Sequence, residues 1–134
     1  MSEPETAPPP SLDEARALVG HKVDDAGGNS VGEVHGFFVD AGSGAPTWLI
    51  AKQGRFSSTL VAIPLGDCAP GGGRVWVAHP RDVVRRAPVV DPARPLLREH
   101  EITICAHYGI GEKVGRAVQV VGREEGSATS RPAL

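Results

Sequence analysis

Five histidines and two cysteines are the residues of this chain best suited to binding a transition metal. His100 and His107 stand seven residues apart in a segment with helical spacing, and Cys105 lies between them. Seven residues of helix rise about 10 Å, which is too far for two ligands of one ion. The other three histidines, His21, His35 and His79, are isolated in the sequence, and we expect them to be surface or turn residues. The spacing therefore predicts no metal site.

Cys68 is the candidate nucleophile, and a catalytic thiol needs a base and an orienting group. His79 and Asp67 could supply these roles, but the sequence does not place them relative to Cys68. Asp24–Asn29 lacks the alternating acids and distal glutamate of a calcium loop. Gly71–Gly73 lacks the Lys-Ser/Thr that follows a phosphate loop. We predict no catalytic residue and no cofactor.

One tryptophan lies near a group of arginines. Trp76 alternates with Val75 and Val77, so it lies on the outer face of a strand. Exposed tryptophan near arginine has the composition of an interface hot spot. The predicted partner-binding residues are Trp76, Arg81, Arg85 and Arg86. A slightly favoured alternative is that the helix over residues 96–108 covers Trp76. The arginines could also contact RNA phosphates, although the chain has few aromatic residues.

Charge is unevenly distributed, although the net charge of −2 argues against a general nucleic-acid binder. Residues 1–33 hold seven acids against two basic residues, and residues 74–98 hold six arginines against two acids. We expect the acidic third to contact the basic stretch of a second copy or of a protein partner. Salt would weaken such pairing, because exposed charges are screened beyond about 8–10 Å at physiological ionic strength.

Length and composition predict one small domain with many turns. The chain has 134 residues, including 17 glycines and 12 prolines, which favours short strands over long helices. No apolar stretch is long enough for a transmembrane helix, and no signal peptide is visible. Without an export signal, the two cysteines are expected to be reduced thiols, and the protein to be cytoplasmic.

The hydrophobic pattern predicts short strands flanked by two helices. Ser11 and Glu14 form a capping box for a helix over Leu12–Leu18. A second helix, Leu96–Tyr108, ends at a glycine, while Asp82–Arg86 is either a strand or one turn of helix. The expected strands are Val19–Val23, Val31–Asp40, Thr47–Lys52, Thr59–Ile63 and Arg74–Ala78.

Two further features concern the shape and extent of the domain. Val34 and Phe37 are out of phase for a flat strand, which predicts a β-bulge near His35-Gly36. The expected organisation is a disordered tail at 1–10, a barrel domain at 11–87, a linker and helix at 88–110 that pack on the barrel, and a flexible tail at 111–134. Within that tail, Val114–Val121 has the composition of an extra strand.

The order of these elements resembles the PRC-barrel domain. The resemblance covers roughly residues 15–86 and rests on short segments in the right order: Ala17–Val23, Val31–Val34, Phe37–Asp40, Thr47–Ala51, Ile63–Leu65 and Val75–Val77. The family includes the cytoplasmic barrel of the photosynthetic reaction-centre H subunit and the C-terminal barrel of ribosome-maturation factors. A helix ending in Tyr108-Gly109 is also similar to the one that follows the barrel in free-standing bacterial members.

The resemblance implies a mainly β fold: a small closed or partly open antiparallel barrel with short flanking helices. It also implies a non-enzymatic scaffold that docks proteins, often as a homodimer, with no shared catalytic residues. The chain lacks the membrane helix of the one relative and the second barrel of the other, so neither specific function transfers. We therefore expect a self-associating protein-binding module without membrane insertion or an evident small-molecule ligand. The alternative is an accessory factor in RNA or ribosome metabolism.

Overall fold

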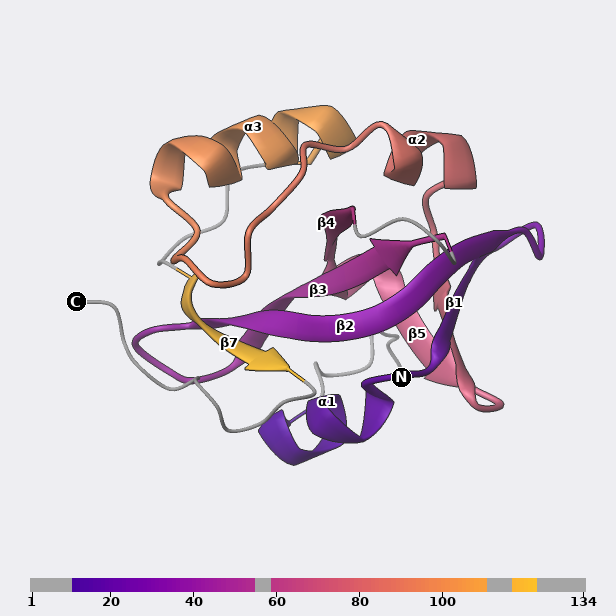
Figure 1. The fold of residues 1–134 in the computed structure, drawn as a ribbon, viewed down its shortest axis with the longest axis horizontal. Coiled ribbons are helices and arrows are strands. Elements are labelled where there is room, and N and C mark those ends of the chain that lie inside the picture. The colour runs from indigo at the N-terminus through magenta and orange to yellow at the C-terminus, as the bar shows by residue number, and fades with distance from the viewer. Residues whose placement is uncertain (1–10, 55–58, 111–116, 123–134) are drawn as a thin grey trace, which may run out of the picture.

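A computed structural model describes residues 11–54, 59–110 and 117–122. The helices are α1 (Leu12–Leu18), α2 (Arg81–Arg85) and α3 (Arg98–Tyr108), with a 3₁₀ turn, η1 (Leu65–Asp67). The strands are β1 (Lys22–Asp25), β2 (Ser30–Asp40), β3 (Pro46–Gln53), β4 (Leu60–Pro64), β5 (Cys68–Gly71), β6 (Arg74–Val77) and β7 (Ala117–Gly122). Figure 1 shows α1 below the sheet, and α2 and α3 above it.

Six of the strands form one curved sheet in the order β4-β3-β2-β1-β6-β5, and β7 pairs with the second half of β2. The sheet is mixed where the sequence favoured antiparallel pairing, since β1 and β6 are parallel and the other pairs of the path are antiparallel. The chain crosses from β4 through η1 into the β5–β6 hairpin, and β6 then enters beside β1 in the same direction. Among the described residues, no ladder of hydrogen bonds between the outer strands β4 and β5 closes the sheet, and the chain passes from one to the other through η1.

Local sequence signals account for much of this architecture. The capping box is present, because Ser11 Oγ accepts from Glu14 N and Glu14 Oε1 accepts from Ser11 N. The predicted bulge appears as a register shift between Val34 and Gly36. Gly109 ends α3 in the left-handed conformation, with φ of 70°. The ambiguous segment after Pro80 is a helix, and the first strand starts three residues later than expected, at Lys22.

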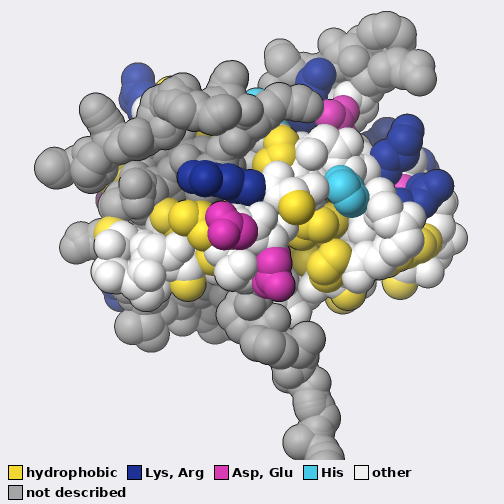
Figure 2. Space-filling model, turned by 90° about the horizontal axis from the view of Figure 1, so that it is seen from below, with side chains coloured by type: hydrophobic (Ala, Val, Ile, Leu, Met, Phe, Trp, Pro, Cys, Tyr) yellow, Lys and Arg dark blue, Asp and Glu magenta, His cyan; other side chains and the backbone are white. Residues whose placement is uncertain are grey.

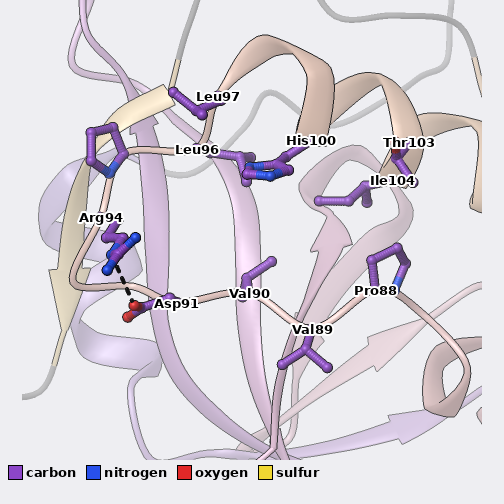
Figure 3. A pocket seen from close by; sticks show the side chains of 11 residues that line it. Pro88, Val89, Val90, Asp91, Arg94, Leu96, Leu97, His100, Thr103 and Ile104 are labelled. Atoms are coloured by element: carbon purple, nitrogen blue, oxygen red, sulfur yellow. Dashed lines mark ion pairs between the residues drawn. The ribbon is translucent and has the colours of Figure 1, made fainter.

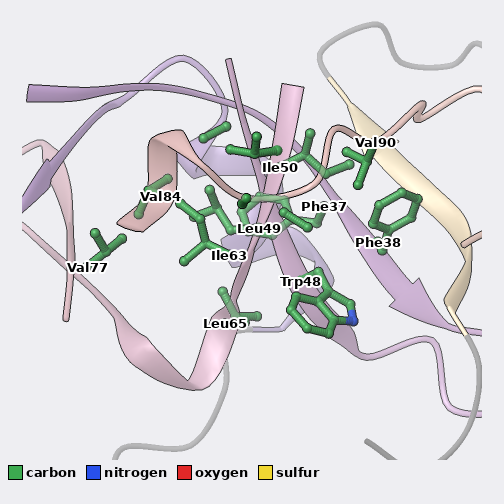
Figure 4. Packing of buried hydrophobic residues seen from close by; sticks show 14 of the residues in the cluster. Phe37, Phe38, Trp48, Leu49, Ile50, Ile63, Leu65, Val77, Val84 and Val90 are labelled. Carbon is green, nitrogen blue, oxygen red and sulfur yellow. The ribbon is translucent and has the colours of Figure 1, made fainter. Parts of the chain in front are cut away.

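The core lies between the curved sheet and the helices. Residues 48–51 of β3 are wholly buried, which is typical of a strand covered on both faces. Figure 4 shows Phe37, Leu49 and Ile63 close together in this core, with Val84 of α2 beside them. Burial of these large apolar side chains is the main stabilising term of such a fold.

Two buried hydrogen bonds attach α3 to the sheet. The Trp48 indole Nε1 donates to Glu101 Oε2 at 2.6 Å, and the Tyr108 hydroxyl donates to the Ala62 carbonyl at 2.8 Å. These two bonds place α3 against β3 and β4. The edge of β4 is also covered, because Val89 bridges to Val61.

Strand β7 lies outside the six-stranded path. Residues 117–122, within the segment that the sequence assigned to a flexible tail and to an extra strand, form β7. The rest of that predicted tail and the predicted tail at 1–10 lie outside the described residues. Among the helices of the described ranges, none is long and apolar enough to cross a membrane.

Candidate protein-docking face

Trp76 lies on the outer surface of β6. The strand alternates strictly, with Val75 and Val77 buried and Arg74 and Trp76 exposed. The Trp76 side chain is 39% exposed, so the alternative in which the later helix covers it is wrong. Helix α3 covers Trp48 instead, and Trp48 is the tryptophan bonded to Glu101. The outward orientation predicted from the alternation is confirmed.

The strand register gives Trp76 three neighbours on this surface. Trp76 pairs with Asp24 of β1 on one side and with Ala69 of β5 on the other. Arg74 shares its face two residues away and forms an ion pair with Asp24, with 2.6 Å between Nη1 and Oδ2. We call this surface, formed by Ala69, Arg74 and Trp76 over the buried Asp24, the β6 face. It consists of an exposed indole between a neutralised ion pair and a small apolar side chain.

The outer strand beside this face is poorly suited to pairing with another strand. Strand β5 has four residues, and Pro70 in its middle has no N–H to donate. Gly71 ends the strand, and Gly72 and Gly73 then turn the chain with positive φ angles of 62° and 77°. A partner at this surface would therefore contact side chains of the β6 face rather than extend the sheet.

The predicted arginines divide into a structural residue and two exposed ones. The backbone N–H of Arg81 donates to Asp25 Oδ2 at 2.9 Å, and its side chain is half-buried. Arg85 and Arg86 are exposed at the end of α2. The four predicted residues thus come from two elements. Sequence reasoning missed Arg74, which the alternation of residues 74 and 76 could have assigned to the face of Trp76.

Asp25 connects the β1–β2 turn to α2. Its Oδ1 accepts from the backbone N–H groups of Gly27 and Asn29, and its Oδ2 accepts from the Asn29 side chain and from Arg81 N. The residue before α2 makes no side-chain capping bond, and the carboxylate of Asp25 in β1 caps the first N–H of the helix instead. The bond from Arg81, followed by those from Asn29, lowers the pKa of Asp25 to about 2.

Acid is therefore expected to destabilise the fold through Asp25. Because its folded pKa of about 2 lies below the ordinary 3.8, ionised Asp25 stabilises the fold above that range, and the contribution is lost as the pH falls toward 2. Asp25→Asn, which cannot titrate, should show a smaller loss of unfolding free energy between about pH 5 and 2. Urea unfolding at several pH values measures this, with exposed Asp13→Asn as the control. Parallel curves for wild type and Asp25→Asn would contradict the assignment.

The three residues considered for thiol chemistry do lie close together, but they form a structural cluster. The Cys68 thiol donates to the Pro64 carbonyl at 3.4 Å, and His79 Nε2 bonds to Asp67 Oδ2 at 2.7 Å. The His79 ring packs on Tyr108 with 4.6 Å between ring centroids. Burial, and then the charge of Asp67, raises the pKa of Cys68, which is the opposite of what a nucleophilic thiol requires.

The two helical histidines have separate environments. His107 Nε2 donates to the Val83 carbonyl at 2.7 Å and so ties α3 to α2. His100 is exposed on the first turn of α3. Over the described ranges, no group of three or more His, Cys, Asp or Glu side chains is placed to hold a metal ion.

The remaining exposed surface is mixed in character. Figure 2, which views the molecule from the α1 side, shows acidic and basic side chains around a small group of hydrophobic ones. In the described part of the chain, the large exposed hydrophobic residues are Trp76, Val89, Leu97 and Ile102. Trp76 is the only aromatic residue among these four, which makes the β6 face the best candidate for docking.

Comparison with known proteins supports the resemblance drawn from the sequence. The PRC-barrel domain matches residues 11–84, which is more than half of the chain. The match runs from the cap of α1 to the buried Val84 of α2. A search of curated proteins finds no match. With a mainly β six-stranded sheet and the family match over the same residues, the chain belongs to the PRC-barrel domain family.

Proposed function

We propose that this protein is a non-enzymatic docking module that associates with a second copy of itself through the β6 face. PRC-barrel domains are generally non-catalytic modules, which supports this class of function. The single observation that carries the proposal is the 39% exposed Trp76 on the outer surface of the sheet. Tryptophan is one of the residue types enriched among interface hot spots.

The surroundings of Trp76 favour its burial in an interface. Asp24 and Arg74 already pair with each other, so a partner that covers the indole need not bury an unpaired charge. Ala69 is small and exposed, which leaves room for a partner's ring beside the indole. In a two-fold dimer the same patch faces itself, so each copy would contribute one Trp76.

Charge would contribute less to self-association than the sequence suggested. Asp24 and Asp25 of the acidic third are engaged within the chain, by Arg74 and by the Arg81 backbone. The exposed charges that remain for a second copy include Asp13 on α1 and Arg85 and Arg86 at the end of α2. Pairing between such exposed groups is worth about 0–1 kcal/mol per pair and is screened by salt.

Trp76→Ala is expected to weaken dimerisation at least tenfold, because truncating a hot-spot residue costs about 2 kcal/mol or more of binding free energy. Sedimentation velocity over a concentration series measures the dissociation constant. Ile102→Ala is the matched control: Ile102 is 40% exposed, nearly the same as Trp76, but lies on α3. The control should dimerise like the wild type.

Two results would contradict the proposal. One is a wild-type protein that remains monomeric at all accessible concentrations. The other is RNA binding that falls steeply with salt and is weakened by Arg85→Glu but not by Trp76→Ala, which would favour the accessory factor in RNA metabolism.

A further inference from the structure

A pocket of about 390 Å³ lies between α3 and the segment that leads into it. Residues 88–91 form one wall, residues 94–97 close one end, and His100, Thr103 and Ile104 of α3 form the other wall (Figure 3). The volume lies within the range of small-molecule sites, about 300–1,000 Å³. If each non-hydrogen atom takes roughly the 30 Å³ that a water molecule occupies in the liquid, the pocket holds about a dozen such atoms.

The lining of this pocket is mainly apolar. Seven of its eleven residues are aliphatic or proline: Pro88, Val89, Val90, Pro95, Leu96, Leu97 and Ile104. Two of them, Val89 and Leu97, are among the most exposed hydrophobic residues of the described chain, at 68% and 50%. Val90, Leu96 and Ile104, in contrast, are buried, at 9%, 6% and 1% exposed, and form the apolar surface against which a ligand body can pack.

The polar groups of the pocket indicate which charge a ligand can carry there. Both carboxylate oxygens of Asp91 are engaged, Oδ1 by the Ala93 N–H at 3.0 Å and Oδ2 by Arg94 Nε at 3.5 Å. The Thr103 hydroxyl donates to the Glu99 carbonyl. The Arg94 contact uses Nε and leaves the two Nη groups as donors, and the His100 ring carries a further N–H. Asp91 is already paired with Arg94, and the two Nη groups of Arg94 remain as the charged donors that the lining offers to an anion.

We propose that this pocket binds a small apolar monocarboxylic acid of about a dozen non-hydrogen atoms. The apolar body lies against Val90, Leu96 and Ile104, and the carboxylate accepts from Arg94 and His100. Arginine binds carboxylates through its planar fork of N–H groups, which supports Arg94 as the main anion contact. The site lies on α3 and its preceding segment, whereas the β6 face lies on β1, β5 and β6, so the two proposals can fail independently.

The test uses 3-phenylpropionate, which has the required size and charge, and its uncharged amide. Binding to the full chain is followed by two-dimensional NMR, which locates the site and gives the dissociation constant from the same titration. The expected result is saturable binding of the acid, with shifts at residues 88–104 and at least tenfold weaker binding of the amide. Equal affinity for acid and amide, or no saturable shift in this segment, would overturn the proposal.

Substitutions within the pocket separate charge from shape. Arg94→Gln should weaken binding of the acid about tenfold. Arg86→Gln, at an exposed arginine just after α2, should have no effect. Thr103→Glu and Thr103→Lys remove the same hydroxyl and introduce good helix formers of opposite charge. The glutamate should weaken binding several-fold and the lysine should preserve it. Unchanged binding in Arg94→Gln, or equal losses in the two Thr103 variants, would contradict the assigned carboxylate site.

Discussion

Gly32→Ala is expected to lower the free energy of unfolding by about 1–3 kcal/mol or more, because forcing extra atoms into a packed structure usually costs about that much. Gly32 lies in β2 between two strands, opposite Val23 of β1 and Gln53 of β3. A Cβ atom at this position would overlap the backbone carbonyl of Lys52, and a backbone group in a sheet cannot rotate away as a flexible side chain can. Relief therefore requires β2 and β3 to separate locally.

Urea unfolding measures this effect, and Gly66→Ala is the matched control. Gly66 is exposed in η1, with nothing within 4 Å of the position that a Cβ would take. The control should stay within about 0.5 kcal/mol of the wild type, as surface substitutions usually do. A Gly32→Ala protein as stable as Gly66→Ala would show that β2 and β3 are not packed as described.

Glu101→Ala is expected to destabilise the protein by about 2 kcal/mol, because it removes the acceptor of a buried donor. The indole N–H of Trp48 donates to Glu101 Oε2 at 2.6 Å, and the Glu101 side chain is 6% exposed. Glu101→Gln keeps an amide oxygen at the same length and should lose less. The three proteins are compared by urea unfolding.

The neighbouring Glu99 provides the control for this prediction. It lies on the same helix but is exposed, so Glu99→Ala should change the unfolding free energy by less than about 0.5 kcal/mol. If Glu101→Ala and Glu99→Ala lost equal stability, the bond to Trp48 would not be what holds α3 on the sheet.

The features that were predictable from the sequence are local ones. The capping box of Ser11 and Glu14 and the glycine end of α3 at Gly109 each depend on residues within a few positions. The bulge between Val34 and Gly36 follows from the side-chain period of a single strand. In the candidate site, the outward orientation of Trp76 was predictable for the same reason.

The features that were missed depend on contacts between distant segments. The parallel pairing of β1 with β6 joins residues about fifty positions apart, and no local pattern records it. Strand β5 was hidden because Pro70 and the glycines after it have the composition of a turn. Likewise, only the contact between Trp48 and Glu101, 53 residues apart, decides which tryptophan α3 covers. The hydrogen bond from the Arg81 backbone N–H to Asp25 also joins distant segments.

Self-association through the β6 face is tested most directly by two-dimensional NMR of the wild-type protein over a concentration series. We predict concentration-dependent shifts and line broadening at the amides of Ala69, Arg74 and Trp76 and at the Trp76 indole. The Trp48 indole, which is wholly buried under α3, should not change and serves as an internal control. Changes confined to other surfaces such as α3, or spectra independent of concentration, would contradict the assignment of Trp76 as the docking residue.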